Sequence, residues 1–261
     1  MLAAFVPSRA ATLEVAGQAV QGGLVQGRVD PGSAVMVDGR PVRVSPDGEF
    51  LIGFGREATK AALEIAYPDG KRERRDIAVA PRRFDIQRID GLPEKMVTPP
   101  PEALERIKRE NEQVAAVRRR DDARTDFRAP FQWPVLGRIS GVYGSQRILN
   151  GQPRAPHYGV DIASPVDTPI RAPADGIVTL AADLYFTGWT VILDHGHGLS
   201  SVFMHMNAIA AEAGQRLRQG DMLGRLGATG RVTGPHLHWG MNWFSTRLDP
   251  ALLVPPMPPA E

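Results

Sequence analysis

The sequence of 261 residues contains no cysteine, which excludes disulfides and thiolate metal ligands. Any metal site must therefore use nitrogen and oxygen ligands. The sequence also lacks an apolar run of about 18 residues, the length that a membrane-spanning helix needs. Charge of one sign is not in large excess either, because 29 Asp and Glu residues nearly balance 31 Lys and Arg residues and leave a net charge of +2. This balance argues against a dedicated nucleic-acid-binding surface.

Turn signals dominate the first third of the chain. Asp38-Gly39 lies between two apolar runs and supplies the positive φ angles that a two-residue hairpin turn needs. Pro46-Asp47-Gly48 and Pro68-Asp69-Gly70 are further turns of the same kind. Turns this frequent, without a helical period between them, predict a small antiparallel β-sandwich over residues 12–98.

Three other segments differ from this region in amino-acid composition. Residues 1–11 resemble the end of a secretory signal, and an ordinary unstructured N-terminus is the alternative. Residues 99–128 begin with three prolines and continue with helix formers, which predicts a linker helix that is either a spacer between domains or a lid over an active site. Its apolar stripe is thin and consists of Leu104, Ile107, Asn111, Val114 and Val117. The proline-rich residues 255–261 are expected to form a disordered tail.

All six histidines lie within residues 129–254. His236 and His238 are two positions apart in a segment with strand character, so both side chains point to one face. Both could reach one metal, or one could bind the metal while the other contacts a bound water. Two structural histidines are the alternative interpretation. His195 and His197 lie in a glycine-rich segment and are interpreted as turn residues.

A second pair of candidate ligands is His157 and Asp161, which are four positions apart and can act from one loop. A set of two histidines and one aspartate leaves a fourth tetrahedral position for water, which is typical of catalytic zinc sites. His205 lies in an apolar strand, where a hydrogen-bonded core histidine is the alternative to a functional one.

Seven ordered segments between residues 139 and 243 resemble the lysostaphin/LytM-type zinc peptidases, which cleave cross-links in bacterial peptidoglycan. The segments are SGVYGSQR (140–147), HYGVDIA (157–163), TPIRAPADG (168–176), DHGHG (194–198), FMHM (203–206), GDMLG (220–224) and GPHLHW (234–239). Any one of them is a weak signal, but their order over about 105 residues makes the match specific.

The resemblance implies that His157, Asp161 and His238 bind one Zn²⁺ per chain. It also implies that His236 acts on the zinc-bound water and that His205 stabilises the transition state across the groove. These two histidines are therefore the expected catalytic residues, and all five positions hold the expected residue type.

The fold class that follows is mainly β. An N-terminal antiparallel β-sandwich and a linker helix precede an antiparallel β-sheet peptidase domain of the LytM type over residues 129–254. We expect a zinc-dependent endopeptidase, a hydrolase that cuts the peptide cross-links of bacterial peptidoglycan through a zinc-activated water. Its expected partners are peptidoglycan stem peptides and an envelope protein that regulates it, and its expected location is the periplasm or cell envelope.

Two other functions stay open at this point. A non-hydrolytic envelope adaptor, or activator of another cell-wall hydrolase, is expected to have lost metal ligands, and this sequence keeps them. A latent enzyme is expected to cover its groove with the sandwich or the linker helix until a partner or proteolysis removes the cover.

Overall fold

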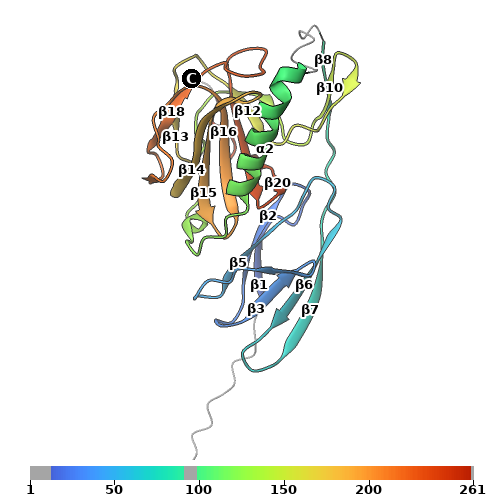
Figure 1. Ribbon diagram of the computed structural model, residues 1–261. Helices are drawn as coiled ribbons and strands as arrows, with labels where there is room; N and C mark the ends of the chain where they lie inside the picture. Colours follow the sequence, from blue (N-terminus) through green and yellow to red (C-terminus); the bar gives the residue numbers. More distant parts are fainter. Residues whose placement is uncertain (1–12, 91–98, 260–261) are drawn as a thin grey trace, which may run out of the picture.

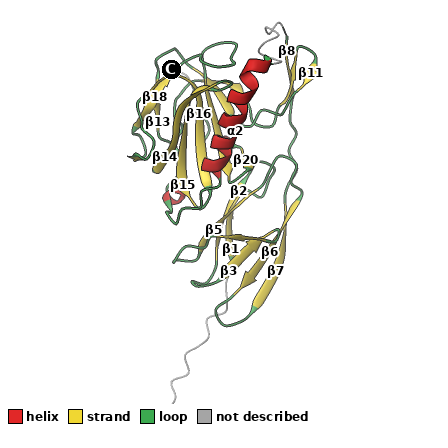
Figure 2. Ribbon diagram, in the orientation of Figure 1, coloured by secondary structure: helices red, strands yellow, loops and turns green. Residues whose placement is uncertain are grey.

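A computed structural model describes residues 13–90 and 99–259, so the segment resembling a secretory signal lies outside the described residues. Strands form most of the regular structure in both halves of the chain, and the described residues contain one α-helix (Figures 1 and 2). The prediction of a mainly β protein is therefore confirmed. No helix in the described ranges combines the length and the apolar character that crossing a membrane requires.

The N-terminal half consists of two small antiparallel sheets, one in the order β1-β2-β5 and one in the order β4-β3-β6-β7. Asp38 and Gly39 have φ angles of 49° and 74° and join β3 to β4, which confirms the predicted hairpin turn. The two sheets bury apolar side chains between them, including Phe50, Ile52 and Leu63. The strands are β1 Glu14–Gly17, β2 Leu24–Arg28, β3 Ala34–Val37, β4 Arg40–Val42, β5 Glu49–Gly53, β6 Lys60–Ala66 and β7 Arg72–Ala78.

The C-terminal half is built on one large sheet in the order β17-β14-β15-β16-β19-β12-β9, with β13, β18 and β20 paired at its sides. One face of its central strands packs into the main core through alternate residues such as Phe203, Trp239 and Met241. The strands are β9 Arg138–Gly141, β12 Val160–Ala163, β13 Pro169–Arg171, β14 Gly176–Leu184, β15 Gly188–Gly196, β16 Leu199–Ile209, β17 Arg216–Leu217, β18 Met222–Leu226, β19 Leu237–Trp243 and β20 Thr246–Leu248.

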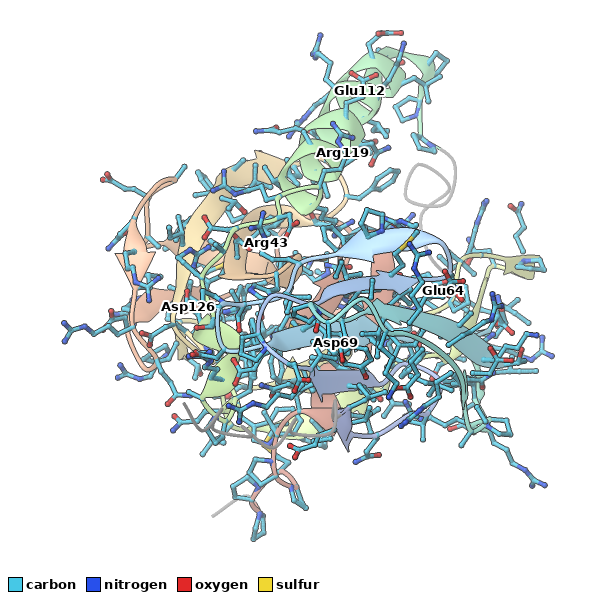
Figure 3. The ribbon with its side chains drawn as sticks, turned by 90° about the horizontal axis from the view of Figure 1, so that it is seen from below. Arg43, Glu64, Asp69, Glu112, Arg119 and Asp126 are labelled. Carbon is cyan, nitrogen blue, oxygen red and sulfur yellow. The ribbon has the colours of Figure 1, made fainter. Side chains whose placement is uncertain are left out.

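The linker helix α2 (Leu104–Arg118) packs on the opposite face of this sheet. Val114 and Val117 of the predicted stripe contact a small apolar cluster that includes Val202. Glu112 and Arg119 lie on the side of the helix segment that faces away from the sheet (Figure 3). Short 3-10 helices precede α2, follow it and end the fold: η1 Pro101–Ala103, η2 Asp126–Arg128 and η3 Pro250–Leu252.

A third small sheet connects the two halves. Strand β8 (Ile86–Ile89) runs parallel to β10 (Gln146–Leu149), which pairs with β11 (Gln152–Pro153). An ion pair of 2.8 Å between Arg82 and Asp249 also joins the halves. The division of the chain into domains at residues 12–98, 99–128 and 129–254 stays a proposal.

The end of the chain differs from the expectation of a disordered tail. Trp133 Nε1 donates a hydrogen bond of 2.8 Å to the carbonyl oxygen of Pro255, and Met257 packs against the main core. Pro255 and Met257 thus have defined contacts, because a carbonyl group and an apolar side chain both find partners on the sheet domain.

The interpretation of His195 as a turn residue is wrong, because His195 lies in β15 and is fully buried. Its Nδ1 donates to the carbonyl oxygen of Asp175 at 2.6 Å, and its Nε2 lies 2.8 Å from Ser201 Oγ. Burial lowers the pKa of His195 to about 4, so the folded protein holds it neutral at pH 7.

Acidification is therefore expected to destabilise the fold through His195. The unfolded chain titrates this group near pH 6.5, so between about pH 6.5 and 4 the unfolded state binds the extra proton and stability falls as the pH is lowered. The loss from this group reaches roughly 3 kcal/mol near pH 4. Urea unfolding at pH 7 and pH 4.5 should show a smaller acid-induced loss for His195→Gln than for wild type, and equal losses would contradict the assignment.

Candidate metal centre

The pairing of β12 with β19 brings two of the predicted ligands together. Asp161 lies directly opposite His238 in this antiparallel pair, so both side chains project from the same face. Met204 of β16 lies opposite His238 on its other side. This is the face on which α2 packs, because Val202 and Gly240 occupy the next matching pair. The predicted site and the linker helix therefore share one face of the sheet.

Three ligand atoms meet at this point. Asp161 Oδ1 lies 2.9 Å from His157 Nε2 and 2.8 Å from His238 Nδ1, and the two imidazole nitrogens are 2.9 Å apart. All three residues are buried, and their ligand atoms lie within 4.8 Å of one another. The structure thus assembles, from a loop and two strands, a set of donor atoms that could hold a metal ion.

Hydrogen bonds to the backbone fix the orientation of His157. Its Nδ1 donates to the carbonyl oxygen of Val142 at 3.0 Å, which leaves Nε2 as the nitrogen with a free lone pair. Burial lowers the pKa of His238 to about 4. Burial alone would raise the pKa of Asp161, but the close contacts with the two histidines outweigh it and hold that pKa well below its usual range. Neutral imidazoles beside a carboxylate are the protonation states that a metal ion requires.

The two remaining predicted histidines lie beside this cluster. The ring centroids of His205 and His236 are 5.0 Å apart, and His236 Nε2 lies 3.7 Å from Asp161 Oδ1. His236 Nδ1 donates to the carbonyl oxygen of Gly234, and His205 Nδ1 donates to that of Thr229. All five residues predicted from the sequence are therefore brought together at one site.

His205 takes up an unusual backbone conformation, with a φ angle of 65° at an irregularity in the pairing of β16 with β15. Such a bulge redirects a side chain that regular alternation would place elsewhere. Burial, with the charges of His238 and His236, lowers the pKa of His205 to about 3. The side chain is therefore neutral in the folded protein at pH 7.

Arg147 is part of this site and was not predicted from the sequence. Its Nη2 lies 3.0 Å from Asp161 Oδ2, so the guanidinium contacts the carboxylate oxygen that the two histidines leave free. Burial lowers the pKa of Arg147, and the charge of Asp161 opposes this effect. Arg147 comes from β10, and its Nε lies 3.4 Å from Gln87 Oε1 in β8, so the small third sheet reaches the metal centre.

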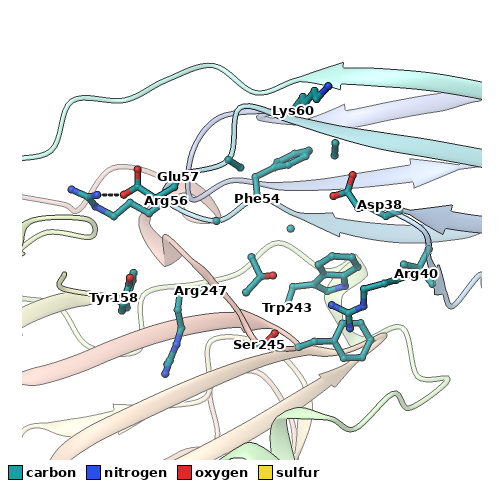
Figure 4. Close-up of a pocket in the computed structure, with 18 of the residues that line it drawn as sticks. Asp38, Arg40, Phe54, Arg56, Glu57, Lys60, Tyr158, Trp243, Ser245 and Arg247 are labelled. Carbon is teal, nitrogen blue, oxygen red and sulfur yellow. Dashed lines mark hydrogen bonds and ion pairs between the residues drawn. The ribbon is translucent and has the colours of Figure 1, made fainter. Parts of the chain in front are cut away.

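A cavity of about 650 Å³ opens between the N-terminal sheets and the end of the large sheet (Figure 4). Phe54 and Arg56 line it from one half of the chain, and Tyr158, Trp243 and Arg247 line it from the other. Tyr158 follows His157 directly in the chain, but none of the five site residues lines this cavity.

Comparison with known proteins identifies the family. The model of Peptidase family M23 matches residues 155–250, which include all five histidine and aspartate residues of the site. The crystal structure of a protein from Pseudomonas aeruginosa described as an M23 peptidase is similar over 91% of this chain and 95% of that one, with 31% identity and a TM-score of 0.71. The chain belongs to peptidase family M23, as the sequence motifs predicted.

Two curated relatives are similar over shorter stretches. The peptidoglycan DD-endopeptidase ShyA of Vibrio cholerae is 37% identical over 115 residues, which is 43% of this chain and 27% of that protein. The cell division protein DipM of Caulobacter vibrioides is 30% identical over 166 residues, which is 61% of this chain and 26% of that protein. The chain thus matches about a quarter of the length of these relatives.

Gly141 is expected to support metal binding through the space that it leaves for Asp161. A Cβ atom at this position would lie 2.5 Å from Asp161 Oδ2 and 3.1 Å from His157 Cε1, so Gly141→Ala must displace the carboxylate. We expect its metal affinity to fall about 10–100-fold, as when the support of a ligand is removed. Titration against a competing chelator measures this affinity. Gly55→Ala is the matched control, since its Cβ would meet only Thr246 at 3.8 Å; equal affinities in the two variants would refute the expectation.

Proposed function

We propose that this protein is a zinc-dependent endopeptidase that hydrolyses the peptide cross-links of bacterial peptidoglycan. The observation that carries the proposal is the contact of His157 Nε2, Asp161 Oδ1 and His238 Nδ1 with one another, next to two further histidines. Membership of peptidase family M23 supports hydrolysis of a peptide bond as the reaction. The name of the Vibrio cholerae relative supports peptidoglycan as the substrate.

The chemistry of the donor set fits zinc. Two neutral imidazole nitrogens at 2.9 Å from each other repel through their lone pairs unless a cation or a shared proton lies between them. Two nitrogens and one carboxylate oxygen match the ligands of catalytic zinc sites, which keep a further position open. The absence of cysteine is consistent with this set. We therefore infer that His157, Asp161 and His238 hold one zinc ion.

Bound zinc would polarise the scissile carbonyl group and lower the pKa of a water molecule. His236 has its Nδ1 engaged by the carbonyl of Gly234, so its Nε2 can accept a proton and pass it to the leaving amine. His205 offers a second Nε2, because Thr229 holds its Nδ1. This residue can stabilise negative charge on the substrate oxygen only after it has taken up a proton.

Arg147 completes the arrangement by contacting the far oxygen of Asp161. This contact leaves Oδ1 directed at the two imidazoles, so the carboxylate presents one oxygen to the metal position. A guanidinium group is suited to this task because its planar donors hold a carboxylate in one orientation. We propose that Arg147 is a positioning residue.

We propose that the bond cut is the D-Ala–diaminopimelate cross-link. This choice rests on the description of the Vibrio cholerae relative as a DD-endopeptidase. The periplasm or cell envelope is the location that follows, because the substrate lies there, and an envelope regulator remains part of the proposal. The adaptor function is disfavoured by the complete set of ligands and histidines. Latency gains no support from α2, whose apolar contacts are with Val202, Met204 and their neighbours and not with the five site residues.

Hydrolysis of purified peptidoglycan sacculi, with metal content determined on the same samples, tests the proposal. Wild type should hold about one zinc per chain and release new amine termini. His238→Ala should lose both properties, because a ligand is gone. His236→Ala should keep its zinc and lose about 10²–10⁴-fold in rate, as expected for a missing proton acceptor.

His197→Asn is the matched control for removal of a histidine. His197 lies outside the site, packs on Phe127 and has a φ angle of 50°, a conformation that asparagine tolerates. We expect zinc content and rate to stay at wild-type levels in this variant. Full activity in His238→Ala, or wild-type protein that binds zinc and leaves sacculi intact, would refute the enzyme assignment.

A further inference from the structure

A row of polar side chains crosses the face of the large sheet beneath α2. Ser200 of β16 lies opposite Asn242 of β19, and Asn242 lies opposite Arg247 of β20. Strand alternation places all three on the same face as His238, which is four positions from Asn242 along β19. At the rise of a strand this separation is about 13 Å. The row therefore lies on the floor that leads away from the metal centre.

These side chains are buried without hydrogen-bond partners. Asn242 is fully buried and Ser200 is 5% exposed. Within the described residues, no partner is found for Ser200 Oγ or for the Oδ1 and Nδ2 atoms of Asn242. The Nε atom of Arg118, which comes from the last turn of α2, is likewise buried and unpartnered. Buried polar atoms without partners are uncommon and indicate a group that the protein alone does not supply.

Two of the residues carry positive charge. Arg118 and Arg247 line one cavity of about 140 Å³ between α2 and the sheet, together with Val202 and Met204. In Figure 4 the side chain of Arg247 points away from the N-terminal sheets. Burial lowers the pKa of both arginines, that of Arg118 to about 9, and the charge of Arg247 adds to the effect on Arg118. Both groups stay charged at pH 7, where their mutual repulsion favours an anion between them.

The carboxylates nearby are already engaged. Glu110, which lines the same cavity, accepts hydrogen bonds from Arg106 and from the backbone N–H of Tyr185. Asp194 lies opposite Ser200 in β15, and Arg124 holds it through an ion pair of 2.6 Å. Among the described residues, neither Arg118 nor Arg247 forms an ion pair with a carboxylate.

We propose that Arg118 and Arg247, which line this cavity, bind a carboxylate group of the peptidoglycan stem peptide. The identity of the peptide rests on the proposed function, whereas the preference for an anion rests on the donors themselves. Guanidinium groups are suited to a carboxylate, because their planar N–H donors can bind both of its oxygens. Met204 lines the cavity and lies opposite His238 in the neighbouring strand, so the cavity adjoins the candidate metal centre.

In this arrangement α2 is neither a spacer nor a lid but a part of the binding site. Because Arg118 lies in its last turn and faces the cavity, the helix forms one wall of the peptide-binding site. Removal of the helix from the sheet would then weaken binding of an acidic peptide instead of exposing the groove for it.

Calorimetric binding of the free stem tetrapeptide L-Ala-γ-D-Glu-diaminopimelate-D-Ala to the full chain tests the subsite. The comparison peptide carries carboxamides in place of its carboxylates. We expect Arg118→Gln and Arg247→Gln each to raise the Kd of the acidic peptide about tenfold or more, and to leave the weak binding of the amide unchanged. Arg109→Gln, on the exposed side of α2, removes the same charge from the same helix and should bind like wild type.

Arg247→Lys is the control for misfolding of the Arg247 variant, since it keeps the charge. Its Kd should lie between those of wild type and Arg247→Gln. Equal affinities of the acidic and amidated peptides for wild type, wild-type affinity in both glutamine variants, or no binding at all would overturn the subsite. The tetrapeptide has no cross-link to cut, so its binding is read separately from catalysis. Hydrolysis of sacculi without this binding overturns the subsite alone, whereas binding without hydrolysis leaves the subsite intact and contradicts the proposed function.

Discussion

The register between β12 and β19 is the constraint on which the site depends. It sets Asp161 opposite His238, and a slip of one residue would turn one of them into the core, because side chains alternate between the two faces of a sheet. Strand β9 on one side and β16 on the other hold the pair in place. Gly141 of β9 leaves the room that the Asp161 carboxylate occupies. The metal centre is thus a consequence of strand pairing more than of any single loop.

The same alternation separates two environments across one sheet. One face carries Trp239 and Met241 into the apolar core, while the other carries His238, Gly240 and Asn242 along a line of increasing distance from the proposed metal position. Different parts of the chain meet this polar face at its two ends. The third sheet brings Arg147 to the metal centre, and α2 brings Arg118 to the far end. Segments outside the large sheet, β10 and α2, therefore contribute side chains to the polar face of that sheet.

Much of this arrangement could be predicted from the sequence because it is encoded locally. The Asp-Gly hairpin, the spacing of His157 and Asp161 and that of His236 and His238 each depend on a few consecutive residues. Three features were not predicted from the sequence. They are the contact between Arg147 and Asp161, the burial of His195, and the position of Arg118 and Arg247 around one cavity. They depend on how strands and helix pack, and no local period or turn signal indicates that Arg118 and Arg247, 129 positions apart, line one cavity.

Diffraction from crystals of the zinc-loaded full chain, recorded on both sides of the zinc absorption edge, tests the central claim most directly. The account predicts one anomalous peak per chain, bonded to His157 Nε2, one oxygen of Asp161 and His238 Nδ1, with Arg147 on the other oxygen. A peak bonded instead to His205 or His236, or no peak at this cluster, would contradict it.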